Sequence, residues 1–356
     1  MTDARIEIDL VSFRHNVRTL STLVAPARTM LAVKANAYGH GMVPLARAAL
    51  ESGADSLAVL EVPAACELRR NGITSQLFAW LHGPHTDFAE AIDRDIDLGV
   101  SALWQLAAIT AAVHAKPARV HLKIDTGLHR NGARPEDWPG LVSAAVAAQR
   151  AGSLTIEGIW SHLADASPEE DAAALARFHR AVDVAASLGC TAPLLHLAAS
   201  SAGIREPGAR LGLVRFGIAA YGISPFDDQT ATELGLRQVM AMRAPVVAVD
   251  TGVARVGVGS GDGIQTAAIG HAHVAIGGSR YPILGIEIDS LTVDVANAAV
   301  SIGDEVTIFG PGDRGEATAE HWAIWAGTVG DEIVARASER LPRVYLDAST
   351  SPVTVR

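Results

Sequence analysis

Eight short apolar runs alternate with longer helical patterns between residues 11 and 225, and this alternation restricts the chain to a few folds. The runs are Met30–Asn36, Ser56–Leu60, Gln76–Leu81, Asp97–Ser101, Arg119–Asp125, Thr155–His162, Leu194–Ser200 and Leu213–Tyr221. Between them, stretches such as Met42–Glu51, Trp104–His114 and Glu169–Leu188 repeat apolar residues at helical spacing. Eight strands alternating with helices predict a closed parallel (β/α)8 barrel. An open, doubly wound sheet also alternates, so the count favours the barrel without excluding the open sheet.

After residue 228 the helical spacing gives way to short apolar runs broken by glycine. These runs are Ala244–Val249, Ala254–Val258, Ala272–Ile276, Tyr281–Val295 and Glu305–Phe309, with turn signals at Gly277-Gly278 and Pro311–Asp313. They predict a second, mostly antiparallel β domain over 228–356, in which Thr328–Arg340 is a helix. The N-terminal segment 1–10 alternates like a strand and is predicted to join this domain, which leaves 11–227 for the barrel.

The composition excludes several classes of protein. A formal net charge of −10, from 29 basic and 39 acidic residues, disfavours binding to nucleic acid. We expect no membrane span, because no stretch supplies the roughly 20 uninterrupted apolar residues that one needs. Cys66 and Cys190 are the only cysteines, too few for a disulfide scaffold or a thiolate metal cluster. We therefore expect a cytoplasmic protein that holds no metal.

Polar residues close several of the predicted strands, at the barrel end where function is concentrated. They are Lys34, Arg130, His162, Ser200 or Ser201, and Arg215. Most have a structural alternative: a lysine that reaches solvent, a solvated loop arginine, a core histidine or helix-capping serines. Arg215 is harder to explain structurally, because it lies between apolar neighbours, keeps its charge and needs an acceptor or anionic partner.

These cations and small polar groups point to a phosphorylated ligand that condenses with an amine. A lysine whose pKa falls on burial becomes a nucleophile. Serine hydroxyls and backbone N–H groups near the last strands of a barrel suit a phosphate. Pyridoxal phosphate meets both requirements, since it forms a Schiff base with lysine while the protein tunes its ring.

The segment AVKANAYGHG, residues 32–41, resembles the signature of the alanine racemase family. The resemblance continues through KIDTGLHRNG (123–132), WSHLADA (160–166), HLAASSAG (196–203), LVRFGIAAYGISP (213–225), DEVTIFG (304–310), AGTVGDEI (326–333) and LPRVYLD (341–347). It covers essentially the whole chain in order. It implies a fold-type III pyridoxal-phosphate enzyme that interconverts L- and D-amino acids, working as a homodimer with active sites at the subunit interface.

The resemblance also implies a role for each matching residue. Lys34 matches the Schiff-base lysine, which is also one of two racemisation bases, and Arg215 matches the arginine on the pyridine nitrogen. Because a guanidinium does not readily release a proton, the ring nitrogen stays unprotonated, which would limit side reactions such as transamination. His162 matches the residue beside the ring.

Other matches concern the substrate and the phosphate. Arg130 matches the arginine near the substrate carboxylate and cofactor hydroxyl, and Lys123 a lysine that is carbamylated in some members to hold that arginine. The phosphate-binding positions are matched by Tyr38, Ser201 (alternatively Ser200), Gly217, Ile218 and Tyr345.

The chain departs from the family in two segments. The family's second base is a tyrosine supplied by the partner subunit, and Ser260 occupies its position within Gly259–Gly263. The family's C-M-D-Q segment near the substrate carboxylate is Glu287–Ser290 here, which places Ile288 at the substrate. An isolated serine is a much weaker acid than a phenol, and losing a positioned acid or base costs roughly 10²–10⁴-fold in rate. Substitutes on the same domain are Asp262, His271 and His273, whereas Tyr281 lies too far along the chain.

Three hypotheses follow. The chain is a racemase with an altered or slow second base, or a pyridoxal-phosphate enzyme that works on one face or on another amino acid. In the third hypothesis it binds the cofactor but has lost most catalysis.

Overall fold

The structure is a computed structural model that describes residues 4–112, 115–192, 194–296, 298–347 and 350–355. The chain divides into two compact units. The barrel unit comprises Leu20–Lys34 and Ala49–Gly217, and the β unit comprises Met1–Thr19, Ala35–Ala48 and Ile218–Arg356. This division groups residues that pack together, so the predicted domain ranges, 11–227 and 228–356, stay predictions.

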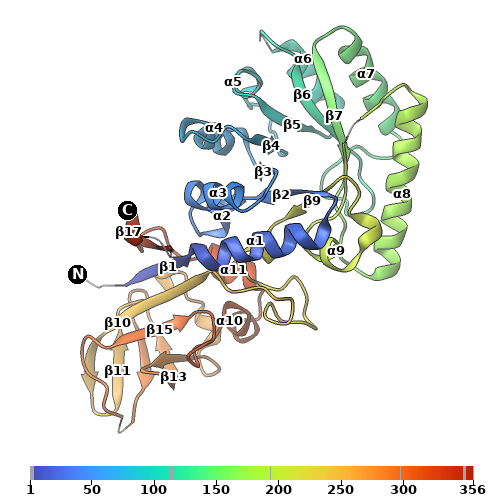
Figure 1. The fold of residues 1–356 in the computed structure, drawn as a ribbon. Coiled ribbons are helices and arrows are strands. Elements are labelled where there is room, and N and C mark those ends of the chain that lie inside the picture. The colour runs from blue at the N-terminus through green and yellow to red at the C-terminus, as the bar shows by residue number, and fades with distance from the viewer. Residues whose placement is uncertain (1–3, 113–114, 193, 297, 348–349, 356) are drawn as a thin grey trace. The chain divides into compact units, whose positions relative to one another are not determined.

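The barrel unit contains an eight-stranded parallel sheet in the order β8-β7-β6-β5-β4-β3-β2-β9 (Figure 1). Its strands are β2 (Arg28–Ala32), β3 (Ser56–Val59), β4 (Gln76–Ala79), β5 (Ile96–Val100), β6 (Ala118–Lys123), β7 (Leu154–Trp160), β8 (Leu194–His196) and β9 (Leu213–Phe216). Two backbone hydrogen bonds, Gly212 N to Leu195 O and Arg215 N to Ala198 O, each 3.1 Å, nearly close the sheet between β8 and β9. The predicted (β/α)8 class is confirmed.

Helices follow the strands of the barrel. They are α4 (Val62–Arg70), α5 (Phe88–Asp93), α6 (Leu103–Ala111), α7 (Trp138–Arg150), α8 (Pro168–Ser187) and α9 (Ser200–Arg205). Helix α8 shows why these residues form a helix: Ser167 caps it by accepting a hydrogen bond from Glu170 N at 3.2 Å, Pro168 begins it, and its first turn is acidic. Its buried face includes Phe178, and the carbonyl of Ala181 accepts a hydrogen bond from the Trp138 indole of α7 at 2.8 Å.

The predicted strands begin within two residues of the observed ones, but several end too late. Strand β2 ends at Ala32, two residues before Lys34, and the segment α2 (Lys34–Tyr38) turns through the left-handed region, with φ of 51° at Ala35 and Tyr38. Strands β8 and β9 likewise stop at His196 and Phe216 rather than at residues 200 and 221. The apolar pattern continues past the end of each strand because the loops at this end of the barrel are also buried. The pattern therefore does not show where the hydrogen bonding between strands stops.

The left-handed turn is costly for L-residues, by roughly 1–2 kcal/mol per residue. Local hydrogen bonds offset that cost: Gly39 N donates to Ala35 O, Gly41 N donates to Asn36 O, both at 2.9 Å, and Asn36 Oδ1 accepts from Met42 N at 2.8 Å. The last of these lies at the start of helix α3 (Met42–Glu51), which has the predicted bounds. The turn therefore belongs to the AVKANAYGHG motif rather than to a strand.

The β unit is built on one nine-stranded sheet, β11-β14-β13-β12-β15-β10-β1-β16-β17, with an additional β10–β11 pairing. That pairing closes an antiparallel barrel of β10 (Met240–Asp250), β11 (Val253–Val256), β12 (His273–Ile276), β13 (Ser279–Ile286), β14 (Leu291–Asp294) and β15 (Glu305–Phe309). Strand β1 (Arg5–Asp9) pairs antiparallel with β10 and parallel with β16 (Arg343–Asp347), which pairs with β17 (Thr350–Val355). The separate β domain is therefore confirmed as the second part of the fold.

Turns and helices of the β unit follow the sequence only in part. Gly277 and Gly278, with φ of 58° and 84°, make the predicted turn between β12 and β13. The predicted helix Thr328–Arg340 is wrong in extent, because only α11 (Gly330–Ala335) is helical there. A helix that was not predicted, α10 (Ala319–Ala326), precedes it and ends at Gly327, whose left-handed φ of 66° stops the helix. Helix α1 (Leu10–Val24) runs from the β unit into the barrel unit.

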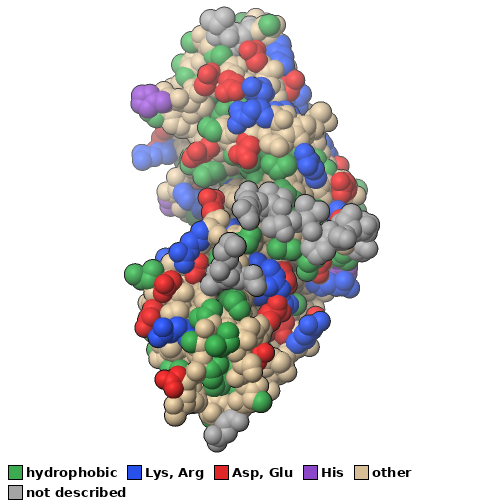
Figure 2. Space-filling view, turned by 90° about the vertical axis from the view of Figure 1, so that its left-hand side faces the viewer, with side chains coloured by type: hydrophobic (Ala, Val, Ile, Leu, Met, Phe, Trp, Pro, Cys, Tyr) green, Lys and Arg blue, Asp and Glu red, His purple; other side chains and the backbone are tan. Residues whose placement is uncertain are grey.

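Three features of the described residues concern the segments and side chains on which the compositional expectations were based. Across the described part of the chain, no helix has the length and apolarity needed to cross a bilayer. Acidic and basic side chains are interspersed over the described part of the face in Figure 2. Cys66 and Cys190 are free and buried.

Candidate active site

Arg215, on β9, lies buried inside the barrel unit among hydrogen-bond acceptors. Its Nη2 donates to the carbonyl oxygens of Ser161 at 2.8 Å and Leu197 at 2.9 Å. The centre of the Trp160 ring lies 5.2 Å from its guanidinium carbon. Burial lowers the pKa of Arg215 to about 9, so the guanidinium is still positively charged at neutral pH. The sequence expectation that this arginine has acceptor partners is met by backbone carbonyls and, as described next, by imidazoles.

His162 follows β7 and faces Arg215. Its Nδ1 lies 3.1 Å from Arg215 Nη2, and because arginine only donates, Nδ1 is the acceptor. Burial first, and then the positive charges of Arg215, Arg130, Lys123 and Lys34, hold the pKa of His162 well below its ordinary value. His162 is therefore neutral, and four of the predicted cations act on it together.

Lys34 and Lys123 supply the primary amines of this group. Lys34 follows Val33, whose N–H donates to Ala58 O at 2.8 Å, and its side chain is half-buried. Lys123, at the end of β6, is buried with its Nζ 4.2 Å from the Trp160 ring centre. Burial and then the charge of Arg215 and Arg130 lower the pKa of Lys123 to about 7. Near neutral pH much of this amine is uncharged, the form that reacts with carbon dioxide; carbamylation of Lys123 stays a prediction.

Arg130 lies exposed in the loop after β6. The loop is held by Asp125, whose Oδ1 accepts from the N–H groups of Gly127 at 3.0 Å and His129 at 3.1 Å. At Gly132 the φ is +134° and a Cβ would lie 2.6 Å from Asp125 N, so the HRNG sequence requires glycine there. The loop thus brings Arg130 into the field that acts on Lys123 and His162.

Ser200 and Ser201 begin helix α9. The Ser200 hydroxyl is buried and accepts a hydrogen bond from Gly217 N at 3.1 Å, while Ser201 is half-buried. The structural alternative for these serines, capping by a side chain, is not what α9 shows, because its N-cap residue is Ala199 and no side chain caps it. Gly217 ends the barrel unit, and Ile218 begins a 3-10 helix, Ile218–Tyr221, of the β unit.

Tyr38 and Tyr345 belong to the β unit. The Tyr345 hydroxyl donates to His40 O at 3.0 Å, and a Cβ on Gly41 would lie 1.9 Å from that hydroxyl oxygen, which explains the last glycine of AVKANAYGHG. The Tyr38 ring packs on Tyr221 with 4.9 Å between ring centres. Burial raises the pKa of both Tyr38 and Tyr345, so each keeps its proton and can donate it to an acceptor.

The two segments in which the chain departs from the family lie side by side in the β unit. Ser260 N donates to Glu287 O at 2.7 Å, and Gly261 N donates to Ile288 O at 2.8 Å. Glycine is required at residue 259, where a Cβ would lie 2.3 Å from Glu287 O. Ile288 is 73% exposed. Sequence positions almost thirty residues apart therefore form one surface.

The candidate substitutes for a second base are placed differently. Asp262 is buried, and its carboxylate accepts two hydrogen bonds from Arg340, of 2.7 and 3.0 Å. Its Oδ2 also accepts a hydrogen bond from Gly259 N. His273 packs on the Trp325 ring at 4.8 Å, and His271 is exposed. Ser260 instead lines a cavity of about 410 Å³ together with residues that include Thr328, Glu332 and Arg336. Within this cavity Glu332 pairs with Arg336 at 2.8 Å and with Thr328.

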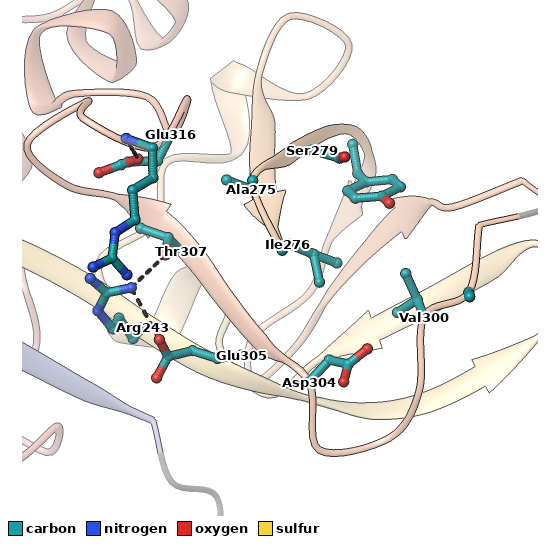
Figure 3. Close-up of a pocket in the computed structure, with 14 residues that line it drawn as sticks. Arg243, Ala275, Ile276, Ser279, Val300, Asp304, Glu305, Thr307 and Glu316 are labelled. Atoms are coloured by element: carbon teal, nitrogen blue, oxygen red, sulfur yellow. Dashed lines mark hydrogen bonds and ion pairs between the residues drawn. The ribbon is translucent and has the colours of Figure 1, made fainter.

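Another cavity of the β unit measures about 750 Å³, and Tyr281 is one of the residues that line it. Figure 3 shows this cavity with Arg243, Glu305 and Thr307 labelled. Its polar groups bind one another: Arg243 Nη1 donates to Thr307 at 2.8 Å and to Glu305 at 3.1 Å, and Glu316 accepts from the backbone of Gly312 and Arg314. None of the predicted site residues lines this cavity, so we assign it no role in the predicted chemistry.

Comparisons with known proteins agree along nearly the whole length of the chain. Residues 8–225 match the model of the alanine racemase N-terminal domain, and residues 242–345 match that of the C-terminal domain. The chain belongs to the alanine racemase family. An alanine racemase of Thermobifida fusca is 40% identical over 97% of this chain and 98% of its own length. The crystal structure of alanine racemase from D-cycloserine-producing Streptomyces lavendulae superimposes with a TM-score of 0.95 at 39% identity, covering 98% of both chains. The alanine racemase of Streptomyces coelicolor A3(2) gives 0.94 at 38% identity.

Members of the alanine racemase family are isomerases that use pyridoxal phosphate, and the barrel unit has a donor set that fits this group. Lys34 offers an amine for its aldehyde, and the cations that act on His162 suit an anionic ligand. Among the described residues, no acceptor is hydrogen-bonded to Arg215 Nε, so this N–H is left to donate to a ring nitrogen. Sequence reasoning missed three buried polar residues behind Arg215, namely Asp97, His121 and His196. Their signal was polarity at positions where strands of a barrel usually hold aliphatic side chains.

Proposed function

We propose that this chain is a pyridoxal-phosphate-dependent racemase that interconverts L- and D-alanine. The observation that carries the proposal is the group of four basic side chains, Lys34, Lys123, Arg130 and Arg215, which act on the buried, neutral His162. Full-length similarity to proteins named alanine racemase supports alanine as the substrate.

In this proposal Lys34 holds the cofactor covalently, Arg215 donates to the ring nitrogen, and His162 lies beside the ring. Groups for the phosphate are the hydroxyls of Tyr38, Tyr345 and Ser201 (or Ser200) and the backbone N–H groups of Gly217 and Ile218. When bound, pyridoxal phosphate stabilises the negative charge left on the α-carbon after its proton is removed. Because Arg215 only donates, it keeps the ring nitrogen unprotonated and restrains side reactions.

The residues of the chain divide the remaining work. Arg130 binds the substrate carboxylate, and Lys123 supports Arg130. The Lys34 amine would take or return the α-proton on one face. We propose a homodimer in which Ser260 of the partner subunit lies at the other face, in the position of the family's second base, and Ile288 of the partner subunit contacts the substrate. Exposed apolar residues of the β unit, Ile288, Ile324 and Val329, suit such an interface, which sedimentation velocity would reveal as a dimeric mass. The two buried free cysteines suit a cytoplasmic location.

The function is tested by incubating the cofactor-loaded protein with L- or D-alanine, and with other amino acids, in deuterated water. Nuclear magnetic resonance measures exchange of the α-proton, and chiral chromatography measures inversion. We expect exchange with inversion of alanine in both directions. Exchange with retention would show one-face chemistry, inversion of a different amino acid alone would change the substrate, and no exchange with any amino acid would leave a cofactor-binding protein.

Ser260→Tyr tests the second face. We expect this variant to racemise alanine faster than the wild type, by up to roughly 10²–10⁴-fold, because a phenol with a reference pKa near 10 is a far better proton donor than an aliphatic hydroxyl. The matched control is Ser260→Phe, which adds the ring without the hydroxyl. Equal rates for the two variants would show that the missing phenol is not the obstacle, and would turn attention to the adjacent Glu287–Ser290 segment.

A further inference from the structure

A continuous line of buried hydrogen bonds crosses the interior of the barrel unit and ends on Arg215. Asp97 Oδ2 lies 3.2 Å from His121 Nε2, His121 Nδ1 lies 3.0 Å from His196 Nε2, and His196 Nδ1 lies 3.2 Å from Arg215 Nη1. The two histidines are 0% exposed and Asp97 is 1% exposed. The line therefore joins β5, β6, β8 and β9 without contact with solvent at its centre.

The chemistry of the two ends determines the direction of every hydrogen bond in this line. A guanidinium only donates, so His196 Nδ1 accepts from Arg215 and carries no proton. The proton of neutral His196 is then on Nε2 and is donated to His121 Nδ1. The proton of His121 is on Nε2 and is donated to the Asp97 carboxylate. The reverse direction would leave both nitrogens of His196 unprotonated, which an imidazole in a protein does not tolerate.

The carboxylate end is anchored separately. Asp97 also accepts from Arg119 Nε and from Gln76 Nε2, each at 2.6 Å. These hydrogen bonds and that of His121 hold the pKa of Asp97 below its ordinary value despite burial, which opposes them, so the carboxylate is ionised at neutral pH. Trp160 stacks on His196 with an interplanar angle of 5°, and Phe78 meets the same imidazole edge-on. The rings are therefore fixed in position as well as in tautomer.

Polar residues in a barrel core are costly, and well-packed apolar side chains of similar volume are often as stabilising. Their placement on one line to Arg215 asks for another explanation. We propose that Asp97, His121 and His196 are positioning residues that hold Arg215 with Nη1 engaged and Nε free to donate to the ligand. The effect of this arrangement on the cofactor rests on the function proposed above. The direction of the hydrogen bonds does not depend on that function.

The direction is measured in the cofactor-free protein. Nitrogen-15 spectra of protein labelled at histidine distinguish the two neutral tautomers and the charged ring. We expect a proton on Nε2 and none on Nδ1 in both His121 and His196 at neutral pH. A proton on Nδ1 of His196, or a charged His196 at neutral pH, would overturn the proposal whether or not the chain is a racemase.

The effect on Arg215 is measured in the loaded protein with His121→Phe and Asp97→Asn. By analogy with residues that orient metal ligands, we expect kcat to fall about tenfold to a hundredfold in His121→Phe, with KM within about twofold of the wild type. We also expect a displaced absorbance maximum of the bound cofactor, because the ring nitrogen loses its fixed donor. Asp97→Asn keeps the shape and removes the charge, and we expect a smaller loss of kcat in the same direction.

The matched control is His82→Phe, the same substitution at another buried histidine of the barrel unit outside the line. We expect it to retain the wild-type kcat and spectrum. If His121→Phe does not fold, Asp97→Asn and the tautomer spectra decide. If His121→Phe and Asp97→Asn fold and keep the wild-type kcat and spectrum, the line of hydrogen bonds only fills the core and does not position Arg215. A protein that binds no cofactor but shows the predicted tautomers would refute the proposed function and retain the hydrogen-bond direction.

Discussion

Replacing Lys34 by alanine is expected to abolish racemisation and the absorbance of covalently bound cofactor, while the protein remains folded. The lysine amine would serve twice, as the group that holds the cofactor and as the base on one face. Loss of the base alone costs about 10²–10⁴-fold, and loss of the covalent link removes the step that precedes it. Because Lys34 is half-buried and lies after the end of β2, its methylenes contribute little to the core. The measurements are the absorbance spectrum, the rate of alanine racemisation and the denaturation midpoint.

The chain offers a sharp control for this prediction, because it has only three lysines, Lys34, Lys116 and Lys123. Lys123 is the alternative candidate for the lysine that binds the cofactor, since its lowered pKa of about 7 also makes its amine nucleophilic. Lys116 serves as the control lysine, because it lies at the surface and forms an ion pair with Asp95 at 2.6 Å. Borohydride reduction of the loaded protein followed by peptide mapping is expected to find the cofactor on Lys34 alone. A label on Lys123, or normal absorbance in Lys34→Ala, would contradict the assignment, and Lys116→Ala is expected to behave as the wild type.

Acid is expected to destabilise the protein strongly between pH 6.5 and pH 4. Burial lowers the pKa of His40 and of His82 to about 4, and burial with neighbouring cations lowers that of His162 and His196 still further. These histidines are neutral when folded and take up protons on unfolding, so the unfolded state binds more protons throughout this window. Stability therefore falls as the pH drops below 6.5, by about 2 kcal/mol at pH 5 for each histidine with a folded pKa near 4.

This pH dependence is measured by denaturant unfolding of the cofactor-free protein at several values between pH 7 and pH 5. In His82→Phe one titrating group is absent, and we expect the stability lost over this interval to be smaller by about 2 kcal/mol than in the wild type. Equal losses in the two proteins would show that His82 titrates normally in the folded state. A wild type whose stability is flat over the interval would contradict the assignment of neutral buried histidines altogether.

The fold class was predictable because strands and helices leave different apolar periods in the sequence, and a barrel repeats them eight times. Strand ends were less predictable. At Lys34 the sequence is apolar enough to continue β2, yet the backbone enters the left-handed region there. The hydrogen bonds that offset that conformation come from Gly39, Gly41 and Met42, which a strand pattern does not take into account. The 3-10 helix Ile218–Tyr221 was likewise predicted as part of a strand, because its residues are also apolar.

The candidate site shows the same division more clearly. The residues of AVKANAYGHG, the arginine of LVRFG and the histidine of WSH were identified from local sequence, because each motif carries its chemistry within a few residues. The sequence also located both departures, at Ser260 and at Ile288, but gave no sign that they are neighbours. Backbone hydrogen bonds between the two segments bring them together, and such bonds leave no mark on side-chain composition.

By itself, the amino-acid sequence determined the barrel, the second β domain, the family and the lysine on which the proposed chemistry depends. Only the tertiary structure decided which buried polar groups meet. Asp97, His121 and His196 are separated from their partners in the line by 24, 75 and 19 residues. The spacing of apolar residues indicates that a position is buried. The hydrogen-bond partner of a buried polar group depends instead on which strands of the sheet face one another inside the barrel. For that reason the line of hydrogen bonds behind Arg215 emerged from the fold and not from the motifs.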